Sequence, residues 1–216
     1  MKTIIQIVLW IACIVFGYLI YKSVTGPIEF NKVKQERYAK VIAKLKDIRN
    51  SQEAYKTVNG KYAADFNKLV SFVDTGNYTI TQQRDSSFMR YDKVYQIDMQ
   101  VDTVIIDTLG TIAVRDSLFK NDDRYKTMME IPGAASGEKV EMKADIIDKG
   151  GYKAPVFEAK VAKDIILYDQ PKDLLAKEKA EASVEEVNGP AIVVGSLEEV
   201  STSGNWPPIY DKKNEQ

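Results

Sequence analysis

The first pattern in the chain is an apolar, uncharged run from Thr3 to Tyr21, interrupted only by Gln6. As a helix these residues cover roughly 28 Å, close to the ~30 Å thickness of the apolar part of a bilayer. The pattern therefore predicts a transmembrane anchor over residues 1–22. Its lipid-facing side chains are expected to be Ile4, Ile7, Leu9, Trp10, Ile14, Phe16, Leu19 and Ile20.

Three other interpretations of this run are weaker. A cleaved signal peptide has a shorter apolar region and a small-x-small site, of which Ser23–Thr25 is a poor version. Lipid attachment to Cys13 is disfavoured because the uncharged, mostly apolar residues continue to Tyr21. A buried core helix is disfavoured by the charged segment directly behind the run. We therefore expect an anchor that is retained.

The charges around the run bear on its orientation. Lys2 precedes it, whereas Lys22, Lys32, Lys34 and Arg37 follow it. Read literally, the positive-inside rule keeps the C-terminal part in the cytoplasm, but the rule is weaker for long domains. The flanking charges alone leave both orientations open.

A second periodic pattern follows the anchor. Gly26–Pro27 predicts a break in the helix and a juxtamembrane linker over 23–30, because proline cannot continue the hydrogen-bond ladder. A long amphipathic helix is then expected from about Phe30 to Val58, ended by Asn59–Gly60. Its apolar stripe alternates spacings of three and four and consists of Tyr38, Val41, Leu45, Ile48, Gln52 and Tyr55. This stripe suits either the protein's own sheet or a partner helix, including a second copy of the chain.

The rest of the chain predicts an α+β domain over 31–210, with the long helix packed on an antiparallel sheet and a flexible tail over 211–216. A short helix is expected at Asp65–Val73, capped by Asp65 and ended by Gly76. Ser117–Lys126 has no clear pattern, and Asp173–Val187 predicts a surface helix. Alternation of apolar with polar residues predicts strands around Ile97–Val101, Val104–Ile106, Thr111–Val114, Val140–Ala144, Phe157–Val161 and Ala191–Leu197, the first of them half-buried.

Composition removes several classes of function. The 216 residues contain no histidine, and the only cysteine, Cys13, lies in the apolar run. Zinc sites and histidine-based catalysis lack their usual ligands and bases. A net charge of −1 without a basic stripe disfavours nucleic-acid binding. The acidic pairs Asp122–Asp123 and Glu198–Glu199 do not have the spacing of a calcium loop. We therefore expect no enzyme activity, no metal and no cofactor.

One local feature near the C-terminus stands out. The segment Gly204–Pro208 places Trp206 beside a rigid, extended Pro-Pro pair. A large aromatic in this position either fills the edge of the core or offers a partner a docking point. Both alternatives remain open from the sequence.

The N-terminal third resembles a known family. An apolar helix leads into a long amphipathic helix, followed by Gln52–Lys56, Asn59–Gly60–Lys61–Tyr62 and a short helix containing Leu69. Over residues 1–73 this pattern resembles the type II secretion pseudopilins and the type IV pilins. The resemblance implies a pilin-like fold exposed outside the cytoplasm, anchored in a bacterial inner membrane.

The chain departs from that family at the processing site. Pilins have a basic leader that ends in glycine, and the fifth residue after cleavage is a glutamate. Here Gly17–Tyr18 would put Lys22 in that fifth place, after the apolar run has ended. We therefore expect a pilin-like subunit that keeps its anchor.

Taken together, these patterns predict a single-pass, non-catalytic subunit of an envelope secretion or assembly complex, with its domain in the periplasm. Its expected partner contacts are the stripe from Tyr38 to Tyr55 and Trp206. The alternative is a membrane-tethered module that binds or senses a small ligand or an envelope polymer.

Overall fold

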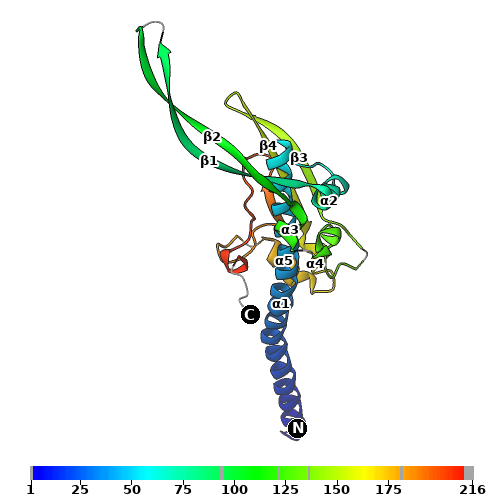
Figure 1. Cartoon of the computed structure of the whole chain (residues 1–216). Helices are drawn as coiled ribbons and strands as arrows, with labels where there is room; N and C mark the ends of the chain where they lie inside the picture. Colours follow the sequence, from blue (N-terminus) through cyan, green and yellow to red (C-terminus); the bar gives the residue numbers. More distant parts are fainter. Residues whose placement is uncertain (1, 93–94, 121, 136, 181, 212–216) are drawn as a thin grey trace.

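The computed structural model describes residues 2–92, 95–120, 122–135, 137–180 and 182–211. One long helix rises from the N-terminus, and the rest of the chain gathers around its upper half (Figure 1). In chain order the elements are α1 (Lys2–Asn59), α2 (Phe66–Thr75), β1 (Asn77–Asp92), β2 (Ile97–Ala113), α3 (Val114–Phe119), the 3₁₀ turn η1 (Asp123–Thr127), β3 (Glu141–Lys149), β4 (Tyr152–Ala162), α4 (Lys163–Ile166), α5 (Lys172–Ala180), β5 (Ala191–Ser196) and the 3₁₀ turn η2 (Pro208–Tyr210).

Helix α1 is continuous over 58 residues and contains Pro27. The predicted break at Gly26–Pro27 is therefore wrong, and residues 23–30 are helical. A proline removes one backbone hydrogen bond and crowds the carbonyl four residues earlier, at a cost of about 3 kcal/mol. Longer helical segments continue on both sides, apolar before it and packed against the body after it. At 1.5 Å per residue the helix is about 87 Å long.

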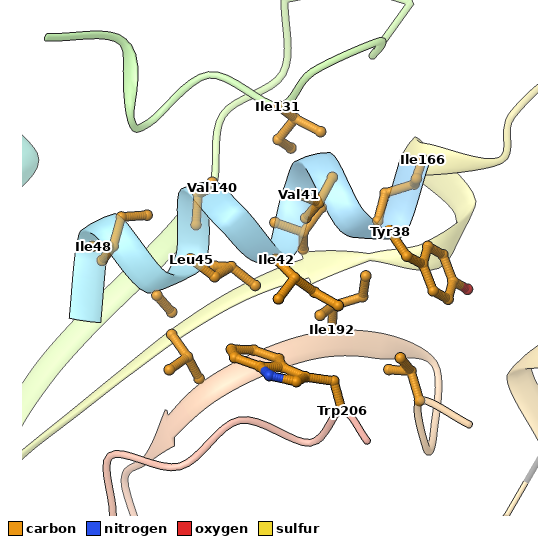
Figure 2. Packing of buried hydrophobic residues seen from close by; sticks show 14 of the residues in the cluster. Tyr38, Val41, Ile42, Leu45, Ile48, Ile131, Val140, Ile166, Ile192 and Trp206 are labelled. Carbon is orange, nitrogen blue, oxygen red and sulfur yellow. The ribbon is translucent and has the colours of Figure 1, made fainter. Parts of the chain in front are cut away.

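The body of the domain is an antiparallel sheet in the order β3-β4-β5, with the C-terminal half of α1 packed against it. The predicted strands around Val140–Ala144, Phe157–Val161 and Ala191–Leu197 correspond to β3, β4 and β5. Figure 2 shows the core between them, where Leu45 and Ile42 of α1 lie above Ile192 of β5. The α+β class with a long N-terminal apolar helix and antiparallel sheets is confirmed.

A smaller core lies beside the far end of α1. Helix α2 matches the predicted helix, and the Asp65 side chain caps it by accepting a hydrogen bond from the Asn67 N–H at 3.2 Å. Val73 of α2 packs with Val114 and Phe119 of α3 and with Tyr125 of η1. The segment without a clear pattern, Ser117–Lys126, thus divides between α3 and η1. This cluster holds the base of the β1–β2 hairpin.

Strands β1 and β2 form a separate two-stranded antiparallel sheet that projects from the body (Figure 1). We call this hairpin, residues 77–113, the arm. From their base, the two strands run away from the N-terminal half of α1 (Figure 1). The predicted strand segments at Ile97–Val101 and Val104–Ile106 both belong to β2, and Thr111–Ala113 ends it before α3 begins at Val114. The half-buried strand expected at Ile97–Val101 is wrong, because Ile97 and Met99 are exposed.

The predicted helix Asp173–Val187 is also shorter than expected, since α5 ends at Ala180. The segment after it leaves the helix so that Val187 can enter the core and its carbonyl can accept a hydrogen bond from Lys163 at 2.7 Å. At the end of the chain, Asp211 pairs with Lys46 at 2.9 Å. The remainder of the predicted tail, 212–216, lies outside the described residues.

Candidate functional site

The anchor residues are all exposed in the chain by itself. Each of the eight predicted side chains is at least half exposed, from Leu19 at 52% to Trp10 at 71%. Helix α1 has mean hydropathy 2.4 over its most apolar window, none of which is buried against the rest of the protein. Transferring so much apolar surface from water to an apolar environment has a strongly favourable free energy. The helix is therefore long and apolar enough to cross a membrane.

The predicted contact stripe faces inward. Tyr38, Val41, Leu45, Ile48 and Gln52 are buried, with at most 1% of any of them exposed, and Tyr55 is half-buried. Figure 2 shows four of these side chains in the core, with Trp206 below Ile42 and Ile192. Of the two alternatives for the stripe, the structure has packing on the protein's own sheet. The five buried side chains are not available to a partner while the domain is folded.

Gln52 is the polar member of the stripe, and its role is internal. Its side-chain amide donates to the Ala63 carbonyl at 2.8 Å and accepts from the Ala63 N–H at 2.9 Å. This two-point contact fixes the loop between α1 and α2. A buried amide with both of its hydrogen-bonding groups satisfied stabilises a fold, whereas an unsatisfied one costs stability.

Trp206 fills the edge of the core rather than offering a docking point. It is 8% exposed, and its indole N–H donates to Asp211 at 3.2 Å. A Cβ atom added at Gly204 would lie 2.3 Å from the indole ring. Only glycine leaves room for the ring there, so the Gly204–Pro208 segment is shaped around Trp206.

A buried cluster of charged residues joins α1 to α4 and α5 on the side of the body nearest the anchor. Glu178 is its centre: its carboxylate accepts hydrogen bonds from Lys34 at 3.0 Å, from Lys163 at 2.9 Å and from Tyr38 at 3.2 Å. Lys34 also pairs with Glu186 at 2.8 Å. Burial, together with the nearby Glu178 charge, raises the pKa of Tyr38 and keeps its hydroxyl protonated. The cluster was not predicted, because its members are far apart in the sequence.

Lys163 is held inside the cluster by hydrogen bonds from its ammonium group. Lys163 is fully buried, and its ammonium donates to the carboxylate of Glu178 and to the carbonyls of Glu178 and Val187. An ammonium has three N–H donors, so all of them are used. The arrangement is therefore that of a structural link.

A second ionic contact strengthens the same region from the surface. The Arg37 guanidinium holds Asp169 with two hydrogen bonds, at 2.6 and 2.8 Å, and also donates to the Ile166 carbonyl. The hydrogen bonds from Arg37 lower the pKa of Asp169 to about 2. Together with the buried cluster, this contact ties α1 to the body within about one turn of Lys34.

The pKa of Lys34 gives a test of the cluster. Burial lowers this pKa, but the hydrogen bonds that Lys34 donates to Glu186 and Glu178 outweigh burial and raise the pKa above its usual value of 10.5. A raised pKa means that folding favours the charged form, so this stabilisation is present below pH 10.5 and is lost as pH rises through the folded-state pKa. We expect the free energy of unfolding to fall at alkaline pH more steeply in the wild type than in Lys34→Met. Urea unfolding at a series of pH values measures this difference; parallel curves would contradict it.

The arm is the largest exposed feature of the described body. Strands β1 and β2 pair along their whole length, from Asn77 with Ala113 to Asp92 with Ile97, with one bulge after Ile80. Most of their side chains are exposed, and large apolar ones occur on both sides of the ribbon. An isolated two-stranded hairpin is at best marginally stable in water. The arm therefore exposes apolar side chains that the rest of the described chain does not cover.

Strand β1 was not predicted, and so the arm was missed. Its apolar residues, such as Tyr78, Ile80 and Phe88, do not alternate regularly over its length. The signal that was present lies in β2, where Ile97, Met99 and Val101 alternate with polar residues. That alternation predicted that one face of the strand is buried. It did not predict that no other part of the described chain covers this face.

The described residues hold no cluster of three or more histidine, cysteine, aspartate or glutamate side chains that could bind a metal ion. Outside the apolar N-terminal part of α1, the described structure consists of a packed body and a projecting arm. Comparison with protein-family models, with curated proteins and with solved structures finds no match.

Proposed function

We propose that this protein is a membrane-anchored, non-catalytic structural subunit of a bacterial envelope secretion or assembly complex. The single observation that carries the proposal is the arm, a long hairpin that leaves large apolar side chains uncovered while every large side chain of the predicted stripe is buried or half-buried. Large exposed apolar patches are typical of protein interaction sites. The arm replaces the stripe as the proposed contact surface.

Helix α1 supports the proposal from the other end of the molecule. Its apolar first third would lie in the membrane, and the same helix continues into the core without an interruption. A continuous helix transmits position, because it bends far less readily than a flexible linker. The subunit would thus hold the arm at a fixed distance from the bilayer surface.

The resemblance of residues 1–73 to pseudopilins and pilins supports the location. In this proposal the anchor lies in the inner membrane and the domain in the periplasm. A long helix packed on an antiparallel sheet is the arrangement that the resemblance implied. The retained anchor would distinguish this subunit from the pilins that are processed and assembled into filaments.

The test is to replace the outer part of the arm, residues 81–108, by a short Asn-Gly turn in the full-length chain. The base of the arm stays in place, because Tyr78 packs against the second core. We expect gentle detergent extraction to recover wild-type chains in a larger complex and the shortened chains without their partner. Native gels and mass spectrometry of the co-purified proteins measure the difference.

The matched control is Ile146→Asp in the β3–β4 hairpin, whose side chain is 55% exposed and lies outside the arm. This substitution should leave the complex intact. Full recovery of the complex by shortened chains that retain a protease-resistant body would overturn the proposal.

A further inference from the structure

The two faces of the arm differ in charge. Residues directly opposite each other on antiparallel strands have side chains on the same face. Phe88 pairs with Val101, Arg90 with Met99 and Arg84 with Ile105, and the face they share is continued by Asp92 with Ile97 and Gln82 with Asp107. We call this the apolar face; its large apolar members are Phe88, Ile97, Met99, Val101 and Ile105.

The charges on the apolar face balance within the face. It carries Arg84 and Arg90 together with Asp92 and Asp107, and Arg84 pairs with Asp107 at 3.0 Å. The opposite face carries Asp85, Asp98 and Asp102 and no basic residue in the paired region 81–92 and 97–108. It also carries exposed large apolar side chains, so the two faces differ in charge rather than in apolar content; these are Met89, Tyr91, Val104 and Ile106. We call it the acidic face. Two acidic faces would repel each other, whereas two apolar faces bring no net like charge together.

We propose that the apolar face of the arm docks against the same face of a second copy of this chain in the same membrane. This inference rests on the proposed function. A self-complementary patch is what a two-fold symmetric dimer requires. The balanced charge allows the face to meet itself, and the acidic face stays in water. The oligomeric contact expected for the long helix is thereby assigned to the arm.

The height of the arm supports a second copy as the occupant. Helix α1 is continuous from the anchor into the core, so each copy presents its arm at the same distance from the membrane. Copies that share a membrane are also confined to a thin layer, which raises their effective concentration. The arm of a second copy therefore lies at the same distance from the membrane as the arm that it would contact.

The size of the face indicates how strong the contact should be. Residues 81–92 extend for about 40 Å, and a ribbon of two strands is roughly 10 Å wide, which gives a face of about 400 Å². Two faces together bury about 800 Å², less than the ~1,200 Å² of a standard stable interface. The contact should therefore be weak between dilute molecules and should depend on the density of the chain in the membrane.

The experiment uses full-length chains carrying Cys13→Ser, reconstituted in lipid vesicles. Two single-cysteine variants on the apolar face, Phe88→Cys and Val101→Cys, are compared with their neighbours on the acidic face, Met89→Cys and Gln100→Cys. A short bismaleimide cross-linker is added, and the fraction of covalent homodimer is read from denaturing gels. The four sites lie in the exposed arm, so the substitutions leave the core unchanged.

We expect the apolar-face variants to give at least about fivefold more homodimer than the acidic-face variants, because like charges disfavour the alternative packing. The yield should fall as more lipid dilutes the chains. Adding Val101→Asp to Phe88→Cys should lower the yield to that of the acidic face.

Two cross-linking results would overturn the inference. The experiment with the shortened arm then decides whether the proposed function survives. Equal yields from both faces, or no homodimer from either, would exclude a second copy as the occupant. If a different protein then co-purifies with the wild-type chain but not with the shortened chain, the proposed function survives. If shortening the arm releases nothing, both the inference and the proposed function fail.

Discussion

The substitution Leu45→Asp is expected to unfold the body of the protein. Leu45 is fully buried between α1 and the sheet. Truncating a buried leucine to alanine already costs about 2–5 kcal/mol, and placing an unpaired carboxylate there costs more. A domain of this size has a stability of about 5–15 kcal/mol in total, so little or none would remain. Limited proteolysis of the full-length chain in detergent should show rapid digestion of residues 30–210.

The control for this prediction is Val58→Asp, the same kind of change in the same helix at a side chain that is 48% exposed. Its body should resist protease as the wild type does. A protease-resistant Leu45→Asp chain that only loses a partner would contradict the packing described above. Such a result would return the stripe to the surface, as a contact for a partner helix.

Glu178→Leu is the second substitution with a large expected effect. It removes the carboxylate shared by Lys34, Lys163 and Tyr38 and leaves Lys163 buried without a counter-charge. Removing one partner of a buried ion pair typically costs about 3–5 kcal/mol. We expect the urea midpoint to fall accordingly, with the slope of the transition unchanged.

Two controls separate this effect from a general loss of packing. The double variant Lys163→Met/Glu178→Leu replaces the pair by apolar side chains and should recover much of the loss, because such replacements are often neutral. Lys179→Ala, on the same helix but at the exposed pair with Asp164, should change stability by about 0–1 kcal/mol. A double variant no more stable than Glu178→Leu alone would show that the ionic cluster is not the cause.

Local patterns were sufficient for the elements whose signal lies in a short stretch of chain. The stripe from Tyr38 to Tyr55 predicted the long helix, and Asp65 with Gly76 predicted the limits of α2 closely. The alternation in β3, β4 and β5 predicted the body of the sheet. These signals are local because each helix or strand must turn one face toward the core.

The misassigned features depended on competition between distant parts of the chain. Pro27 was expected to end a helix, but the anchor on one side and the packed stripe on the other are long enough to continue through it. The helix expected to reach Val187 stops at Ala180. An irregular path lets the side chain of Val187 enter the core and lets its backbone carbonyl accept a hydrogen bond from Lys163.

The sequence by itself determined that this protein has an apolar N-terminal run long enough to span a membrane as a helix, a long amphipathic helix and an antiparallel sheet, and that no histidine or cysteine follows Cys13. Only the tertiary structure decided which apolar faces are covered. The stripe of α1 is covered by the protein's own sheet, whereas the alternating face of β2 is left open on the arm. The physical reason is that hydrophobic periodicity shows only that one face of an element is apolar. What covers that face depends on packing between residues that are far apart in the chain or that belong to another chain.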